Sequence, residues 1–533
     1  MARIELLDLN DDVLRIIFTH IPNIMNVALT CRRIHDLAIE CIIAVVWIRT
    51  TERLRRLCNY ALSPPRYRAV YIEELSVWTK THEDREANDR AQDADALLGK
   101  LLVKAQNLRS IEINRFAGVM KKSSLARKAL GTMSYLTEAT LLDINEASLS
   151  VLPSMKHLRT MTLYFEGSPK VEALVTALAA CPSLLKLTLK AKPSLGLPPK
   201  CSHVPSSSIT SLQDLTLYWC SSRTLELVHV CPNLSSLTIE GMDRAKGAEL
   251  KVIEQFPPKL RRIYIPQLPY FYLVERSCAP GALQFLHLGD HWSHESIIYL
   301  GNEEDHSVRV TRQVLALIRG TSPVGLRICL HAPLQPDSFW ATLAATAPRL
   351  RFLDITISLR SESPDIPDAS WTELLLDSLR NLPLVCLKLY LPNIQTDMRH
   401  LTYDIWADRA LSSNPDVARK LYQQRQEEIT AKVVVHRNAV AHAMLAHMED
   451  LPERLANDLP NLKYLAFGSE AQAIMMQNPR TASGIMAPSC VYNWYKAVAE
   501  GEKKRMVAIP PKEGEKVWET LKDGDLSVVE NIQ

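Results

Sequence analysis

Glycine is scarce in this sequence: the 533 residues include only 17 glycines. No two glycines flank a single residue, so the GxGxxG loop of dinucleotide-binding folds is absent, and no GxxxxGK precedes a serine or threonine. The chain also lacks the HExxH helix of zinc proteases and the GxSxG turn of hydrolases. We therefore expect a protein that is not an enzyme, with no catalytic residues and no cofactor.

Paired cysteines and long apolar runs are missing too. The 11 cysteines are scattered without a CxxC spacing, as is usual for thiols kept reduced in the cytosol or nucleus. The longest apolar stretch, 41–48, is less than half the ~18 residues that a membrane-spanning helix needs. The first residues show no basic and apolar signal for secretion. These features predict a cytoplasmic and/or nuclear protein that does not bind membranes.

Strong charge of either sign is absent. The net charge is +3, whereas phosphate-binding domains usually carry a clear basic excess, so we expect no nucleic-acid partner. The composition, 47% hydrophobic and 23% charged, is that of a folded chain. A protein partner is the better expectation.

Three short helices are predicted at the N-terminus. Asn10 can cap the first, and Asp11 and Asp12 follow in its first turn, where the helix dipole favours carboxylates. Three apolar stripes repeat at helical spacing. Their members are Val13, Leu14, Ile17, Phe18 and Ile21; Ile24, Val27, Ala28 and Cys31; and Ile34, Leu37, Ala38, Cys41 and Ile42. About forty residues form a thin core, which favours a covering partner.

The order of residues in this segment resembles the F-box motif. The resemblance rests on Leu9, Asp12, Val13-Leu14, Ile17-Phe18, Ile21 and Cys31-Arg32-Arg33. It implies docking onto a Skp-type adaptor of a cullin-RING ubiquitin ligase. By the same resemblance, the adaptor contacts would be Leu9, Val13, Leu14, Ile17, Phe18 and Pro22. The alternative is a plain helical cap that covers the end of a repeat core.

A short phrase, LxxLxL, returns along the chain from residue 108. Clear examples are LRSIEI from Leu108, LRTMTL from Leu158, LLKLTL from Leu184, LQDLTL from Leu212, LSSLTI from Leu234, LRRIYI from Leu260 and LQFLHL from Leu283, and LTEATL from Leu136 fills the gap between the first two. The mean period of about 25 residues lies within the range of leucine-rich repeats. Apolar residues two apart face one side of a strand, so neighbouring units must stack to cover them.

The predicted fold class is α/β: an N-terminal three-helix F-box followed by a leucine-rich-repeat solenoid, with parallel strands on its concave face and helices outside. The repeats resemble those of F-box leucine-rich-repeat proteins. We expect an F-box-like domain at 1–48, a helical linker at 49–107 and the solenoid at 108–492. A helical insertion is expected at about 393–459, and a charged, partly disordered tail at 493–533.

Outward-facing strand positions are the candidates for target binding, because their neighbours point into the core. They include Lys190, Tyr218, Trp219 and Glu240, and the aromatic pair could anchor a contact. Packing at the end of a strand is the alternative for Tyr218 and Trp219.

One histidine-rich segment is a candidate for a metal site. His287, Asp290, His291 and His294 lie close together, but their spacing fits no usual zinc signature, and we expect no metal site. The leading hypothesis is a substrate-recognition subunit of an SCF-type ubiquitin ligase with an unknown protein target. A repeat scaffold without ligase function is the main alternative, and a metal-dependent enzyme built on these histidines is the third.

Overall fold

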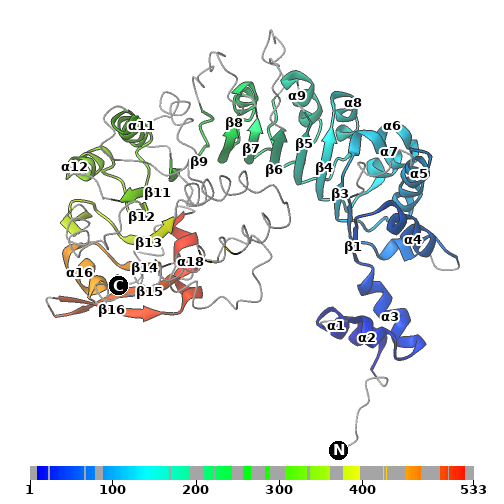
Figure 1. Cartoon of the computed structure of the whole chain (residues 1–533), viewed down its shortest axis with the longest axis horizontal. Helices are drawn as coiled ribbons and strands as arrows, with labels where there is room; N and C mark the ends of the chain where they lie inside the picture. Colours follow the sequence, from blue (N-terminus) through cyan, green and yellow to red (C-terminus); the bar gives the residue numbers. More distant parts are fainter. Residues whose placement is uncertain are drawn as a thin grey trace, which may run out of the picture. The chain divides into compact units, whose positions relative to one another are not determined.

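The computed structural model describes most of the chain (Figure 1). The described residues are 9–21, 24–64, 68–78, 88–166, 170–191, 208–220, 222–242, 256–265, 283–288, 306–332, 337–360, 376–377, 379–395, 424, 428, 450–469, 492–501 and 503–522. The chain divides into two compact units, 1–251 with 257–259 and 252–256 with 260–533. Both units contain parallel strands that alternate with helices, which is the arrangement of an α/β repeat solenoid.

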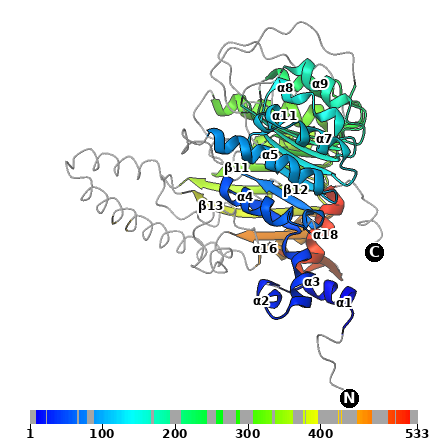
Figure 2. The same cartoon turned by 90° about the vertical axis from the view of Figure 1, so that its right-hand side faces the viewer.

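The first unit begins with three short helices at the positions of the three apolar stripes: α1 (Asp11–Thr19), α2 (Ile24–Ala28) and α3 (Arg32–Ile42). The Asn10 side chain caps α1 by accepting a hydrogen bond of 2.8 Å from the Val13 backbone N–H. Figures 1 and 2 show these helices as a group of their own, joined to the strands through α3.

The strands of the first unit lie side by side in chain order, each parallel to the next. They are β1 (Val45–Ile48), β2 (Glu74–Val77), β3 (Ser110–Ile113), β4 (Glu138–Ile144), β5 (Thr160–Phe165), β6 (Lys186–Ala191), β7 (Asp214–Cys220) and β8 (Ser236–Met242). The connecting helices are α4 (Thr51–Ala61), η2 (Arg68–Tyr71), α5 (Asn88–Lys104), α6 (Phe116–Lys122), α7 (Ser124–Thr132), α8 (Glu146–Leu149), η4 (Leu152–Ser154), α9 (Val171–Ala179) and η5 (Ser222–Val228). Helices α5 to α9 lie on one side of these strands (Figure 1). We call the other side the open face of the first unit.

A ladder of backbone hydrogen bonds sets the register where each strand begins. The N–H groups of Arg109 and Ser110 both donate to the carbonyl of Glu73, at 2.7 and 3.1 Å. Those of Thr137 and Glu138 donate in the same way to the carbonyl of Arg109. The pattern continues through the acceptor carbonyls of Thr137, Arg159, Leu185 and Gln213. Each strand is thus fixed one strand spacing from its neighbour, with the leucine phrases in register.

The segment 49–107, predicted as a helical linker, contains the helices α4, η2 and α5, but it also contains β2, which pairs with β1 and β3. The stacked strands therefore begin before residue 108. Helix α3 leads into β1 within three residues. The sequences of β1 and β2, VVWI and ELSV, do not carry the full leucine phrase, which is why the pattern failed to reveal them.

The second unit continues the same construction and ends differently. Its parallel strands are β9 (Arg262–Ile265), β10 (Phe285–Leu288), β11 (Gly325–Ala332), β12 (Phe352–Arg360), β13 (Cys386–Gln395) and β14 (Tyr464–Ser469). Two antiparallel strands complete the sheet, β15 (Tyr492–Glu500) and β16 (Lys503–Ile509). The helices are α11 (His306–Thr321), α12 (Asp337–Thr346), α16 (Leu451–Asp458) and α18 (Pro511–Lys522). Helix α18 lies on the opposite side of the strands from α11, α12 and α16 (Figure 1).

The tail predicted from residue 493 is therefore wrong as far as residue 522. Its charged residues alternate with Trp494, Trp518 and Leu521, which are 1%, 5% and 2% exposed and hold β15 and α18 against the preceding strands. Residues 523–533 lie outside the described part of the chain. So does most of the insertion expected at 393–459, of which β13 takes the first residues and α16 the last.

Helix α18 also forms an ion pair with a buried lysine of β13. The Lys388 ammonium lies 3.2 Å from Oε1 of Glu515 on α18, and 3.9 Å from the centre of the Tyr492 ring. Nε1 of Trp494 donates to the same carboxylate oxygen at 3.2 Å.

Within the described residues, no helix combines the length and apolar character needed to cross a bilayer.

Candidate protein-interaction site

The N-terminal helices share a core of their own. Leu14 and Phe18 on α1 are 0% and 2% exposed, and they pack with Ile34, Leu37 and Ala38 of α3. Ala28 of α2 completes the buried set. The core contains no residue of the strands, so the three helices, which we call the helical cluster, hold together by their own apolar contacts.

Two arginines tie the cluster together at its surface. Nε of Arg15 lies 2.8 Å from the Glu40 carboxylate, which joins α1 to α3. The hydrogen bond with Glu40 raises the pKa of the Arg15 guanidinium, so this group stays charged. Arg33 donates to the Asp11 carboxylate at 2.9 Å and to the Leu9 carbonyl at 2.8 Å. These ties fix how α1 lies on α3, and therefore which apolar side of α1 remains outside.

The outer surface of the helical cluster is apolar at four positions. On α1, Val13 and Ile16 are 39% and 63% exposed, and they lie one turn apart on one side of the helix. At α2, Met25 and Leu29 are 56% and 78% exposed and are likewise one turn apart. Pairs of large exposed apolar side chains on short helices are typical of positions that another protein covers.

The six predicted adaptor contacts differ in their burial. Leu14 and Phe18 form the cluster core and present no surface to a partner, so their assignment as contact residues is corrected. Leu9 and Ile17 are half-buried against that core. Val13 is exposed, and Pro22 lies outside the described residues.

Sequence reasoning missed Ile16, Met25 and Leu29. The signal was present for α1, because Ile16 follows Val13 by three residues, a spacing that places both on one side of a helix. Helix α1 is apolar on two sides, and only the fold shows which of them is buried.

A second candidate surface lies on the open face of the first unit. Tyr164, Lys190, Tyr218 and Glu240 occupy neighbouring positions on β5, β6, β7 and β8 and form one row across the strands. All four are half-buried, and the Lys190 ammonium lies 4.8 Å from the centre of the Tyr218 ring. The structure thus brings together three of the four predicted target residues and adds Tyr164.

A row of threonines runs beside them. Thr140, Thr162, Thr188, Thr216 and Thr238 are partners in the register from β4 to β8. Every one is half-buried and alternates with buried residues that face the helices. The spacing between strands, about 4.8 Å, places a line of hydroxyl groups next to the aromatic row.

Trp219, the fourth predicted target residue, adopts a left-handed conformation. Its φ is +54°, and its side chain is 50% exposed. A bulky residue in this region carries roughly 1–3 kcal/mol of backbone strain, and such strain often accompanies function. The conformation turns Trp219 out of the strand alternation, so that Cys220 becomes the next buried residue.

The histidine segment gives no site in the described part of the chain. His287 on β10 is half-buried and packs edge-on against Tyr264, with ring centres 4.2 Å apart. Asp290, His291 and His294 lie outside the described residues. Among the residues that are described, no group of three or more metal-binding side chains comes together.

Most of the cysteines in the described part of the chain are buried free thiols, whereas Cys31 is exposed. Burial raises the pKa of Cys58 and Cys231 to about 12 and that of Cys181 to about 11. Cys220 behaves in the same way, and its thiol donates to the Leu189 carbonyl at 3.5 Å, which links β7 to β6. Thiols with raised pKa values are poor nucleophiles near neutral pH.

Comparison with protein-family models finds no match to the chain, and comparison with curated proteins finds none either.

Proposed function

We propose that this protein is the substrate-recognition subunit of an SCF-type ubiquitin ligase. The helical cluster would bind a Skp-type adaptor, and the open face of the first unit would hold the protein to be modified. Ubiquitin transfer would take place on other subunits of the ligase. The resemblance of the first forty residues to the F-box motif gives the proposal its partner class.

The observation that carries the proposal is the exposed apolar surface of a helical cluster that already has its own core. If the cluster only capped the repeats, its apolar side chains would be covered by β1 and α4. Instead, Ile16, Met25 and Leu29 are each more than half exposed. Burying such side chains under a partner contributes about 1.5–3 kcal/mol for each one fully covered, which offsets part of the free-energy cost of association.

The open face supports the target-binding half. The row from Tyr164 to Glu240 combines two tyrosines with a cation and an anion, and the half-exposed Trp219 follows Tyr218 on β7. Tyrosine and tryptophan supply most of the binding energy in many interfaces because they bury a large area with few rotatable bonds. The threonine row adds hydroxyl groups that can both donate and accept hydrogen bonds.

The adaptor-binding half is tested with the full chain co-expressed with a Skp-type adaptor. We expect the wild type to co-purify with the adaptor, and Ile16→Asp and Leu29→Asp each to weaken the complex at least tenfold. Leu125→Asp is the matched control, because Leu125 on α7 is an apolar side chain 45% exposed at a distance from the helical cluster. Circular dichroism of each variant checks that the fold is retained.

Two results would count against this half of the proposal: no adaptor bound by the wild type, or equal binding by the wild type and both charged variants. A protein that bound no adaptor, yet lost a protein partner on Trp219→Ala, would fit the repeat scaffold instead.

A further inference from the structure

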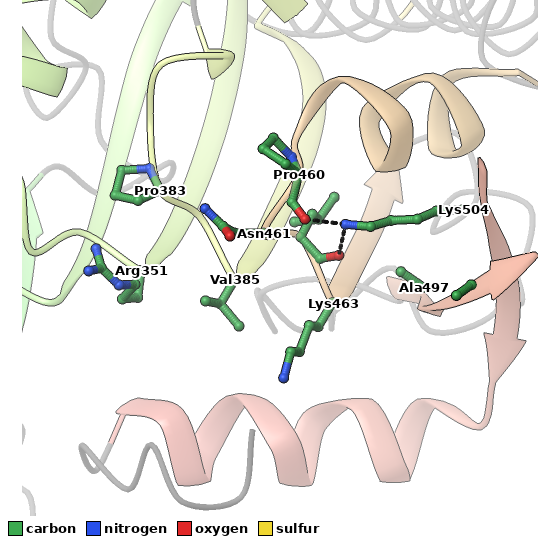
Figure 3. A pocket seen from close by; sticks show the side chains of 10 residues that line it. Arg351, Pro383, Val385, Pro460, Asn461, Lys463, Ala497 and Lys504 are labelled. Atoms are coloured by element: carbon green, nitrogen blue, oxygen red, sulfur yellow. Dashed lines mark hydrogen bonds between the residues drawn. The ribbon is translucent and has the colours of Figure 1, made fainter. Parts of the chain in front are cut away.

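A hollow in the second unit lies where its strands begin. Its volume is about 500 Å³, within the range of small-molecule sites. The segments that precede β12, β13 and β14 form one side, and the β15–β16 hairpin forms the other (Figure 3). Neither the helical cluster nor the open face of the first unit contributes to it.

Three cations from separate segments line this hollow, and its ten lining residues include no carboxylate: Arg351 before β12, Lys463 before β14 and Lys504 on β16. Figure 3 shows Arg351 and Lys504 on opposite sides, with Lys463 between them. Strand β13 separates Arg351 from Lys463, so their backbones stand about two strand spacings, roughly 10 Å, apart.

Backbone carbonyls hold two of these cations in place. The Lys504 ammonium donates to the carbonyls of Pro460 and Leu462, and the backbone N–H of Lys504 donates to Oδ1 of Asn457 at 3.0 Å. Nη1 of Arg351 donates to the carbonyls of Pro348 and Leu350, at 3.0 and 3.1 Å. Carbonyls orient these groups but do not neutralise them, so the positive charges remain.

Burial and the neighbouring positive charge both affect the pKa of Lys504. Burial lowers the pKa of the Lys504 ammonium, and the nearby charge of Lys463 lowers it further. An anion placed between the two would favour both charged forms. Phosphate and carboxylate oxygens also make the short, strong hydrogen bonds that arginine and lysine donate.

We propose that this hollow is a binding site for a small molecule that carries at least two anionic oxygen groups, either phosphates or carboxylates. Two such groups can span the distance between the cations, whereas a single anion reaches only part of the set. The inference does not depend on the proposed ligase role, because it uses other residues in the other unit.

Isothermal titration of the full chain with inorganic pyrophosphate, at an ionic strength of about 0.15 M, tests the site. We expect saturable binding, and a loss of at least tenfold in affinity for Lys463→Gln and for Lys504→Gln. Lys504→Arg should recover part of the binding lost in Lys504→Gln, since it restores the charge. A parallel titration with citrate shows whether phosphate or carboxylate is preferred.

The matched control is Lys503→Gln. Lys503 is the exposed neighbour of Lys504 on β16, and it does not line the hollow. Removing its charge should leave affinity within a factor of two. The proposal is overturned if neither anion binds saturably to the wild type, or if Lys503→Gln weakens binding as much as Lys463→Gln does.

Discussion

Helix α18 lies so close to β15 that a single methyl group should disturb it. A Cβ added at Gly514 would lie 2.1 Å from Cγ and 2.2 Å from Cδ2 of Trp494, far inside van der Waals contact. The tryptophan cannot easily give way, because it is 1% exposed and its Nε1 donates to Glu515. Gly514→Ala therefore forces the helix away from the strands.

Two effects of opposite sign compete in this variant. Alanine is favoured over glycine inside a helix by about 1 kcal/mol. Overpacking of a well-filled core costs about 1–3 kcal/mol, and loss of the Trp494 hydrogen bond to a charged acceptor adds about 1.5–3 kcal/mol. The clash should win, so we expect a net loss of about 1.5–5 kcal/mol in the local free energy of unfolding.

Gly118→Ala is the matched control, and we expect it to stabilise its helix. Gly118 lies on α6, where the nearest atom to an added Cβ is 3.9 Å away, so only the helix-propensity gain remains. Hydrogen exchange suits the comparison, because two compact units need not unfold in one transition. We expect faster exchange in β15 and α18 for Gly514→Ala and slower exchange in α6 for Gly118→Ala. Slower exchange of α18 in Gly514→Ala would refute the reasoning.

Two further predictions concern buried groups. Leu14→Ala removes a side chain that is 0% exposed and should destabilise the helical cluster by about 2–5 kcal/mol. Ile16→Ala, at an exposed site, should change the stability of the cluster by less than about 0.5 kcal/mol. Hydrogen exchange of α1 and α3 distinguishes the two variants. Iodoacetamide at pH 8 should alkylate exposed Cys31 but not Cys58 or Cys231, whose pKa values burial raises to about 12, as peptide mass spectrometry would show. The same shifts stabilise the fold below pH 9, and this contribution is lost as the pH rises from about 9 towards 12, because the unfolded thiols ionise first. Modification of Cys58 at the rate of Cys31 would contradict the buried assignment.

Much of the strand layer could be predicted because one physical requirement repeats. Each LxxLxL phrase buries its apolar residues on one side of a strand, so aligning the phrases also aligns the outward positions. This is why Lys190, Tyr218 and Glu240, chosen separately, fall in one row. Tyr164 occupies the same place in its phrase and could have been found in the same way.

Other elements lacked such a signal. Strands β15 and β16 pair antiparallel and carry no leucine phrase, and their lysines and glutamates suggested a solvated tail. Burial of Trp494 depends on α18, which follows it by some twenty residues, so no local pattern reveals it. Helix α1 is apolar on two sides, and the sequence did not show which of them is buried. The structure shows that the side with Leu14 and Phe18 packs against α3.

The third position of the leucine phrase explains why the outward strand faces of the two units differ. In the first unit this position is polar in LRSIEI, LTEATL, LRTMTL, LLKLTL, LQDLTL and LSSLTI, and the residues stand half-buried or exposed on the open face. In the second unit LRRIYI still has a polar residue there, Arg262, but in LQFLHL, LRFLDI, LVCLKL and LKYLAF it is Phe285, Phe352, Cys386 and Tyr464, all at most 6% exposed.

Aromatic rings on the outer side of a strand need a cover, and α18 supplies it: Trp518 meets Phe285 edge-on, with ring centres 6.0 Å apart. A polar row needs none, because water solvates its hydroxyl and charged groups. Helix α18 therefore covers these rings in the second unit, whereas no described helix of the first unit lies over its open face. A protein partner that binds strands should choose the first unit, where Trp219 and the row from Tyr164 to Glu240 lie.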